Sequence, residues 1–193
     1  VFSLFMGGCG SAVEPEKRMY PLAVGVDASA EDILVSYGMP DLSQSTGQGK
    51  EEEDGSTRVL QISGSDFREQ IYDRSQEKFL DMGHVQVFVL GQTILEDGRW
   101  RMVLEYLKQE PFTGEDIYVF VTSQAQEVLK WQGENNSSAG EYITGLMENR
   151  MSEQRNQAVT LRDVFYRWYK EDSLPVLPRI TVTDSSLEIT GLG

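Results

Sequence analysis

The residue with the most distinctive chemistry in this sequence is Cys9, the only cysteine of the chain. It follows the apolar run VFSLFM and two glycines, in the order Met6-Gly7-Gly8-Cys9. An apolar residue, two small residues and a cysteine form the pattern of a bacterial lipobox, which ends a secretory signal peptide. The thiol would accept a diacylglyceryl group, and its acyl chains would anchor the protein at about 0.8 kcal/mol per buried methylene. The alternatives are a buried strand over residues 1–6 or an incidental free thiol.

Few other residues have the type and spacing that catalysis requires. His84 is the only histidine and begins an apolar segment, so we expect a packed or capping residue rather than a general base. The sequence contains no G-x-S-x-G elbow and no G-x-G-x-x-G fingerprint, and GQGK at residues 47–50 lacks the spacing of a phosphate-binding loop. The acidic run EEED at residues 51–54 is interpreted as a solvated loop tip rather than a cation cage. We therefore predict a non-catalytic protein with no cofactor and no metal site.

Composition disfavours several classes of function. The chain has 31 acidic and 17 basic residues and a formal net charge of -14. Such a surface repels nucleic acid and anionic headgroups, so neither a nucleic-acid partner nor a polybasic membrane contact is expected. A single cysteine excludes an intrachain disulfide and a cysteine-rich zinc site. After residue 9 no apolar run approaches the roughly 18 residues of a membrane span, so membrane attachment would depend on the lipid at Cys9.

Alternating apolar segments predict a mixed sheet with helices packed on it, an α/β (α+β) fold. Strands are predicted over residues 19–27, 32–39, 58–63, 84–90 and 116–122, the first two forming a hairpin. Helices are predicted over about 66–80, 99–110 and 123–131, with capping boxes that begin at Asp66 and Ser123. Because strands and helices alternate after residue 58, part of the sheet should be parallel. The three tryptophans, at positions 100, 131 and 168, lie on predicted helix faces and are assigned to the core.

The same patterns predict how the chain is divided. Residues 1–8 are assigned to residual signal peptide, 9–18 to a lipid-attached tether, 19–132 to an N-terminal mixed α/β domain and 133–140 to a linker. Residues 141–193 are assigned to the start of a second, smaller α/β domain. It carries an amphipathic helix around Tyr142–Met147, a second helix that opens at Thr160, and a strand. We expect the natural chain to start before Val1 and to continue past Gly193.

Several segments follow one another in the order of a known family. After the Cys9 motif come EPEKR, the strand PLAVGVD, and ISGSDFREQIYDRSQ, which enters a helix. The most specific segment is GHVQVFVLGQTILEDG, which matches the family pattern GHLKVVIIGEELAKEG, and VLEYLKQEPFTG, DIYVFVTSQAQEVL and LPRITVTDSSLEITGLG follow it. In this order the chain resembles the N-terminal part of the Ger(x)C family, the lipoprotein C subunits of nutrient germinant receptors in endospore-forming bacteria. It departs from the family at Gly10, usually Trp, and at QEPFTG, which replaces the charged residues of RDxExR.

The resemblance implies a role in spore germination. Such subunits assemble with two integral-membrane partners, the A-type and B-type germinant receptor subunits. We therefore expect a lipid-anchored, non-catalytic receptor subunit on the extracytoplasmic face of the cell or inner spore membrane, with Cys9 as the lipidated residue. The resemblance transfers no ligand-binding pocket. The alternative is a solute-binding lipoprotein that delivers a small molecule to a membrane transporter, which would require two lobes around a cleft. An anchored hydrolase would require a nucleophile and a base.

Overall fold

A computed structural model describes residues 18–40, 59–64, 79–110, 113–133, 137–149 and 158–192 of the 193-residue chain. Cys9, the EEED run and most of the helix predicted over residues 66–80 lie outside the described residues. In the described part, no helix combines the length and the apolar character that are needed to cross a membrane.

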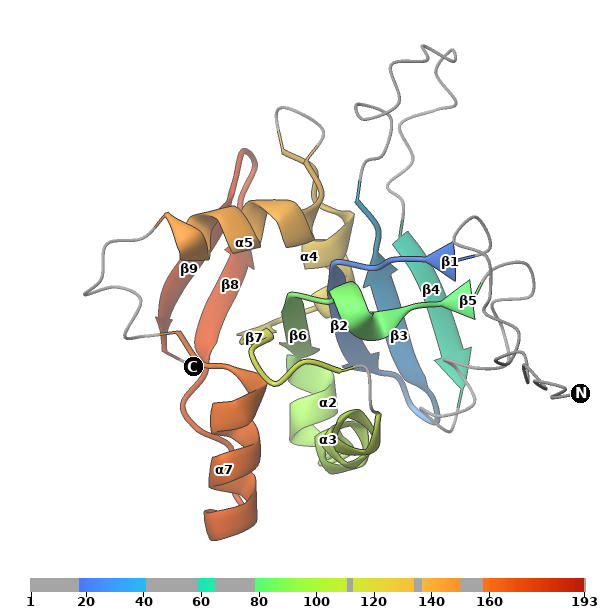
Figure 1. Ribbon diagram of the computed structural model, residues 1–193, viewed down its shortest axis with the longest axis vertical. Coiled ribbons are helices and arrows are strands. Elements are labelled where there is room, and N and C mark those ends of the chain that lie inside the picture. Colours follow the sequence, from blue (N-terminus) through green and yellow to red (C-terminus); the bar gives the residue numbers. More distant parts are fainter. Residues whose placement is uncertain are drawn as a thin grey trace, which may run out of the picture.

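The fold is built on a mixed sheet of seven strands, in the order β4-β3-β2-β6-β7-β8-β9 (Figure 1). The strands β2, β6, β7 and β8 run parallel to one another, whereas β3 and β9 run antiparallel to their neighbours. The predicted hairpin at the start of the sheet and the parallel strands that follow it are therefore confirmed. The bounds of the strands are β2 (Ala23–Ala28), β3 (Ile33–Gly38), β4 (Val59–Gly64), β6 (Val87–Gly91), β7 (Tyr118–Thr122), β8 (Pro178–Val182) and β9 (Leu187–Leu192).

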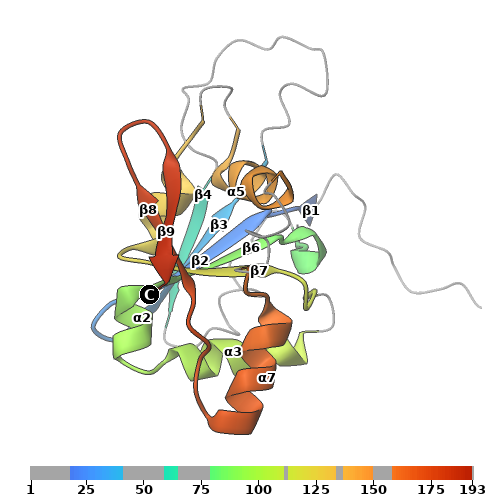
Figure 2. The same ribbon diagram turned by 90° about the vertical axis from the view of Figure 1, so that its left-hand side faces the viewer.

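Helices cover both faces of this sheet. Figures 1 and 2 show α2 (Gln92–Glu96), α3 (Trp100–Gln109) and α7 (Leu161–Glu171) on one side, and α4 (Ala125–Lys130) and α5 (Ala139–Glu148) on the other. Alternate residues of each central strand enter the two cores: Phe88 and Leu90 of β6 pack with α3 and α7, and Val87 and Val89 pack with α4 and α5. All five residues of β6 are buried, which explains why this segment is apolar on both faces.

The segment that follows residue 141 joins the same sheet. The residues before α7 run beside β7, where the Val119 N–H donates to the Val159 carbonyl (2.8 Å) and Tyr118 forms an antiparallel bridge with Thr160. After α7 the chain forms β8, which pairs parallel with β7. Leu161 and Val164 of α7 lie in the core of the first five strands. The strands and helices assigned to a second domain thus extend the sheet and core that residues 19–132 begin.

Element boundaries differ from the sequence prediction at three places. The strand expected over residues 19–27 begins only at Ala23, and the other two places flank residue 81. Phe79 and Leu80, expected at the end of a helix, form the short strand β5 (Phe79–Leu80), which pairs parallel with β1 (Arg18–Met19). The strand expected from His84 begins only at Val87, because Met82–His84 form a 3-10 turn, η2. Long-range contacts explain the two differences beside residue 81: the Asp81 N–H donates to the Met19 carbonyl at 2.8 Å, and its carboxylate accepts from Arg18 at 2.7 Å.

Candidate functional site

A buried carboxylate lies where the central parallel strands end. In open α/β sheets, ligands bind beyond the carboxyl ends of the strands, where neighbouring connections leave in opposite directions. In this chain β2 is followed by the hairpin to β3, which lies on one side of β2 in the sheet. In contrast, β6 is followed by α2 and α3 and then by β7, which lies on the other side. Asp27 is the last buried residue of β2 at this point, and only 7% of it is exposed.

The Asp27 carboxylate binds the start of α4. One oxygen, Oδ1, accepts from the Ala125 N–H at 2.8 Å, and the other, Oδ2, accepts from the Gln126 N–H at 3.0 Å. The residue that precedes the helix, Gln124, makes no side-chain cap of its own. Asp27 therefore supplies, from a strand 98 residues away, the acceptor that the first backbone amides of a helix need. The local cap predicted at Ser123 is wrong, because α4 begins at Ala125.

Burial has the largest influence on the pKa of Asp27. It raises the pKa of Asp27 above the ordinary aspartate value, and the charge of Glu127 acts in the same direction. The hydrogen bonds from the Ala125 and Gln126 amides act against this rise. The carboxylate is thus held by the helix amides in a place where its charge is poorly solvated.

Gly91, at the end of β6, leaves the space that Asp27 occupies. A Cβ atom at position 91 would lie 1.9 Å from Asp27 Oδ1 and 3.3 Å from the Val26 carbonyl oxygen. Any side chain at position 91 would therefore displace the carboxylate. The carboxyl edge between β2 and β6 is filled by the protein's own acid, which links β2 to the start of α4 and lies beside Gly91.

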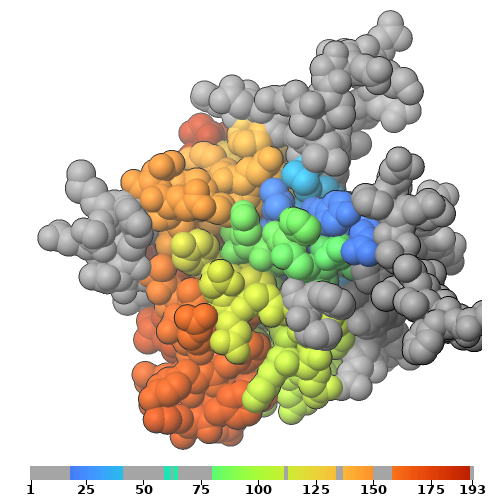
Figure 3. Space-filling model, in the orientation of Figure 1, coloured from blue at the N-terminus to red at the C-terminus, as the bar shows by residue number. Residues whose placement is uncertain are grey.

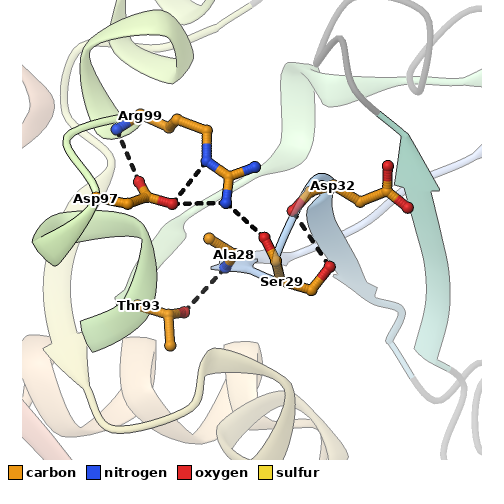
Figure 4. A network of polar contacts seen from close by, with 6 residues as sticks. All are labelled: Ala28, Ser29, Asp32, Thr93, Asp97 and Arg99. Atoms are coloured by element: carbon orange, nitrogen blue, oxygen red, sulfur yellow. Dashed lines mark hydrogen bonds and ion pairs between the residues drawn. The ribbon is translucent and has the colours of Figure 1, made fainter.

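The same edge is tied to α2 and α3 by exposed polar contacts (Figure 4). The Ala28 N–H donates to Thr93 Oγ1 at 2.9 Å, and Arg99 Nη2 donates to the Ser29 carbonyl at 2.6 Å. Arg99 also donates through Nε to Asp97 Oδ2 at 2.6 Å. Partial burial acts to raise the pKa of Asp97, but its hydrogen bonds and charge contact with Arg99 hold it below the ordinary value. These contacts join the β2–β3 turn to the turn between α2 and α3.

A second candidate lies on the surface, where α3 and α7 meet. Tyr166 and Tyr169 of α7 are 61% and 55% exposed. The Lys108 ammonium, from α3, lies 3.4 Å from the centroid of the Tyr169 ring. Lys170 lies 4.5 Å from the centroid of the Tyr166 ring and donates to its hydroxyl at 2.7 Å. We call these four residues and Arg101 the α3–α7 face.

Two tryptophans lie beside this face and join the two helices. Trp100 of α3 and Trp168 of α7 pack edge to face, with their ring centroids 6.3 Å apart, and Trp168 also contacts Tyr169. Arg101 lies over the Trp100 ring at 4.3 Å. The structure confirms the core assignment for Trp100, which is 7% exposed, but Trp131 and Trp168 are only partly buried. Aromatic rings and arginine are enriched in binding surfaces, so this face is a candidate binding surface.

The remaining chemical candidates have structural contacts. His84 is exposed in η2, where its ring packs edge to face on Tyr20 at 4.9 Å. His84 is thus a packed residue, as expected, but it lies in a 3-10 turn and not at the start of a strand. Asp81 accepts from Arg18 and from the Gly83 N–H. Across the described ranges, no three His, Cys, Asp or Glu side chains gather where they could hold a metal ion.

The sequence contained signals for both sites that were missed. PLAVGVD was interpreted as a strand, but its final acidic residue, Asp27, directly after buried apolar positions, is the sign of a carboxylate at a strand end. Tyr166 and Tyr169 lie between the apolar residues of α7, a position that by itself predicts only an exposed helix surface. Nothing in the local sequence pairs Lys108 with Tyr169, which is 61 residues away. Only the packing of α3 beside α7 brings them together.

Comparison with protein families decides the wider identity of the chain. Residues 11–182 match the model of the spore germination protein N-terminal domain. The chain belongs to this family. The resemblance of its ordered segments to the N-terminal part of the Ger(x)C family is therefore confirmed. No curated protein and no solved structure matches the chain.

The match spans every described strand of the seven-stranded sheet except β9, and it also spans Asp27, Gly91 and the α3–α7 face. The two candidate sites therefore belong to the germination domain itself. Membership of the family supports a role in spore germination for this chain.

Proposed function

We propose that the protein is a lipid-anchored, non-catalytic subunit of a nutrient germinant receptor. In this proposal Cys9 carries the lipid, and the domain lies on the extracytoplasmic face of the cell or inner spore membrane. It assembles there with the integral-membrane A-type and B-type receptor subunits. The observation that carries the proposal is the family match at residues 11–182, which begins two residues after the Cys9 motif.

The arrangement of the site supports a binding role. At the carboxyl edge of β2 and β6, the Asp27 carboxylate is engaged by two backbone amides and fills the space beside Gly91. The aromatic rings of the α3–α7 face, in contrast, lie on the surface of two well-packed helices. A rigid domain with an exposed aromatic face suits a protein that works by assembly.

Cell fractionation tests the anchor. Cys9→Ala in the full-length protein removes the thiol that would receive the lipid, so the protein should move from the membrane fraction to the soluble fraction. Gly10→Ala is the matched control, because it changes the neighbouring residue and leaves the thiol in place. Equal membrane association of the two variants would contradict a lipid anchor at Cys9.

Germination assays test the receptor role. Spores that lack the gene should fail to respond to particular nutrients and should still germinate with a non-nutrient trigger. Complementation with the wild-type gene should restore the nutrient response. If nutrient and non-nutrient germination fail together, the protein acts downstream of nutrient recognition and the receptor assignment is wrong. Binding of a nutrient to the purified chain alone would instead favour a solute-binding lipoprotein.

A further inference from the structure

The α3–α7 face differs in charge from the rest of the chain. The residues of α3 and α7 include five basic and three acidic side chains, whereas the remainder of the sequence has 12 basic and 28 acidic residues. Physiological salt screens charges that lie more than about 8–10 Å away, so the acidic regions of the chain beyond that distance have little effect on these two helices. The net charge of the whole chain therefore does not describe what this face attracts.

The two lysines of the face are not neutralised by carboxylates. Elsewhere on α7, Arg167 pairs with Glu171 at 2.8 Å, and Arg162 pairs with Glu115 at 3.4 Å. The ammonium groups of Lys108 and Lys170, in contrast, lie on the rings of Tyr169 and Tyr166, and among the described residues neither forms an ion pair. Arg101 reaches one carboxylate, that of Asp172, only at 3.7 Å with both side chains largely exposed. The two lysines of this face therefore keep their charge available to an anion outside the molecule.

The form of the face indicates what kind of anion it fits. Tyrosine, tryptophan and lysine side chains each have an apolar body and a polar end. They are therefore found at the headgroup level of a bilayer, between the hydrocarbon core and water. Figures 1 and 2 both place α7 at one extreme of the molecule, and Figure 3 shows it adjoining α3 there. A projecting end can meet a flat membrane surface, whereas a peptide ligand would be better held in a groove.

We propose that the α3–α7 face binds the phosphate headgroups of an anionic bilayer. This contact fixes which end of the domain lies against the membrane. It differs from the expectation, based on net charge alone, that the chain makes no electrostatic membrane contact. The contact is separate from the lipid on Cys9, so it can be measured on unlipidated protein.

Vesicle flotation of the unlipidated 193-residue chain tests the proposal. The chain should float with vesicles of phosphatidylglycerol and phosphatidylcholine in equal parts and not with phosphatidylcholine alone. Lys108→Gln and Lys170→Gln should each lower the affinity about fivefold, since a basic residue near an anionic membrane contributes about 1 kcal/mol. Lys130→Gln is the charge-matched control, because Lys130 ends α4 on the opposite face of the sheet, and its affinity should stay unchanged.

A second readout reports insertion of the rings. Tyr166→Ser together with Tyr169→Ser should weaken binding to the same vesicles, and brominated acyl chains should quench tryptophan emission more in the wild type than in this variant. Circular dichroism confirms that each variant is folded. If the chain does not float at 0.1 M salt, or if Lys130→Gln weakens binding as much as Lys170→Gln, the face does not bind headgroups. A protein partner would then be its occupant. Neither result bears on fractionation of the Cys9 variant.

Discussion

The contact between Gly91 and Asp27 makes Gly91→Ala the most informative substitution in the fold. The backbone at position 91 is compatible with alanine, with φ -71° and ψ 157°, so strain in the main chain does not contribute. The added Cβ would lie 1.9 Å from Asp27 Oδ1. Because non-bonded heavy atoms rest about 3.5 Å apart, the carboxylate must move by about 1.5 Å. The 2.8 Å hydrogen bond from the Ala125 amide cannot survive a displacement of that size.

The expected loss of stability follows from these two effects. Overpacking a well-packed site costs about 1–3 kcal/mol, and loss of a helix cap costs about 0.5–2 kcal/mol. Gly91→Ala should therefore lower the free energy of unfolding by about 2–4 kcal/mol. In an Asp27→Ala background the obstructing carboxylate is absent, and the next contact is the Val26 carbonyl at 3.3 Å. There the same substitution should cost less than about 1 kcal/mol, since only a slight shift is needed.

Urea unfolding of four proteins, followed by tryptophan fluorescence, measures this double-mutant cycle. The coupling between positions 27 and 91 should be at least about 1 kcal/mol, as for residues in direct contact. Gly38→Ala, in strand β3 on the other side of β2, is the matched control, because its Cβ would meet nothing closer than 3.6 Å. Its effect should stay within about 1 kcal/mol. If the effects of Gly91→Ala and Asp27→Ala are additive, the two residues are not in direct contact and the reasoning is refuted.

Four further predictions use the same unfolding assay. Burial raises the pKa of Asp27, so the native state holds its proton above the pH at which the unfolded chain loses it. The free energy of unfolding should fall as pH rises from about 4 through the raised pKa, and Asp27→Asn should remove this component of the pH profile. Within α5, Gly140→Ala should destabilise the protein by about 1–3 kcal/mol, because its Cβ would lie 2.8 Å from the Leu22 Cβ. Gly145→Ala, in the same helix with open space around it, should stabilise by about 0.5–1 kcal/mol. Asp163→Ala should lower stability by about 1 kcal/mol, since this carboxylate accepts from the Thr160 N–H at 2.9 Å.

The elements whose signals are local were predictable from sequence. The alternation in β2 and β3, the fully apolar β6 and the start of α7 at Thr160 all depend on neighbours within a few residues. The short strand β5 was not predictable, because its two residues pair with β1, some 60 positions earlier. The same holds for β8: nothing in its own sequence shows that it pairs parallel with β7 and so extends the first sheet.

Candidate sites follow the same rule. Cys9 is recognisable because a lipobox is a short contiguous motif, and it stays a prediction. Asp27 could be recognised as an acid at a strand end, but its partners, the Ala125 and Gln126 amides, are almost 100 residues away. Net charge is least informative at the α3–α7 face, because an average over the chain does not show that Lys108 and Lys170 lie close together on two neighbouring helices.

The carboxyl edge and the α3–α7 face are mechanically connected. The chain passes from Gly91 directly into α2 and then α3, and Arg99, the residue before α3, donates to the Ser29 carbonyl of the β2–β3 turn. The orientation of α3 is therefore set by the edge that Asp27 closes. Since α3 packs beside α7 through Trp100 and Trp168, displacement of that edge would change the spacing of Lys108 from Tyr169. The geometry of the proposed binding surface thus depends on the buried acid at the carboxyl edge, and Gly91 leaves the space that this acid occupies.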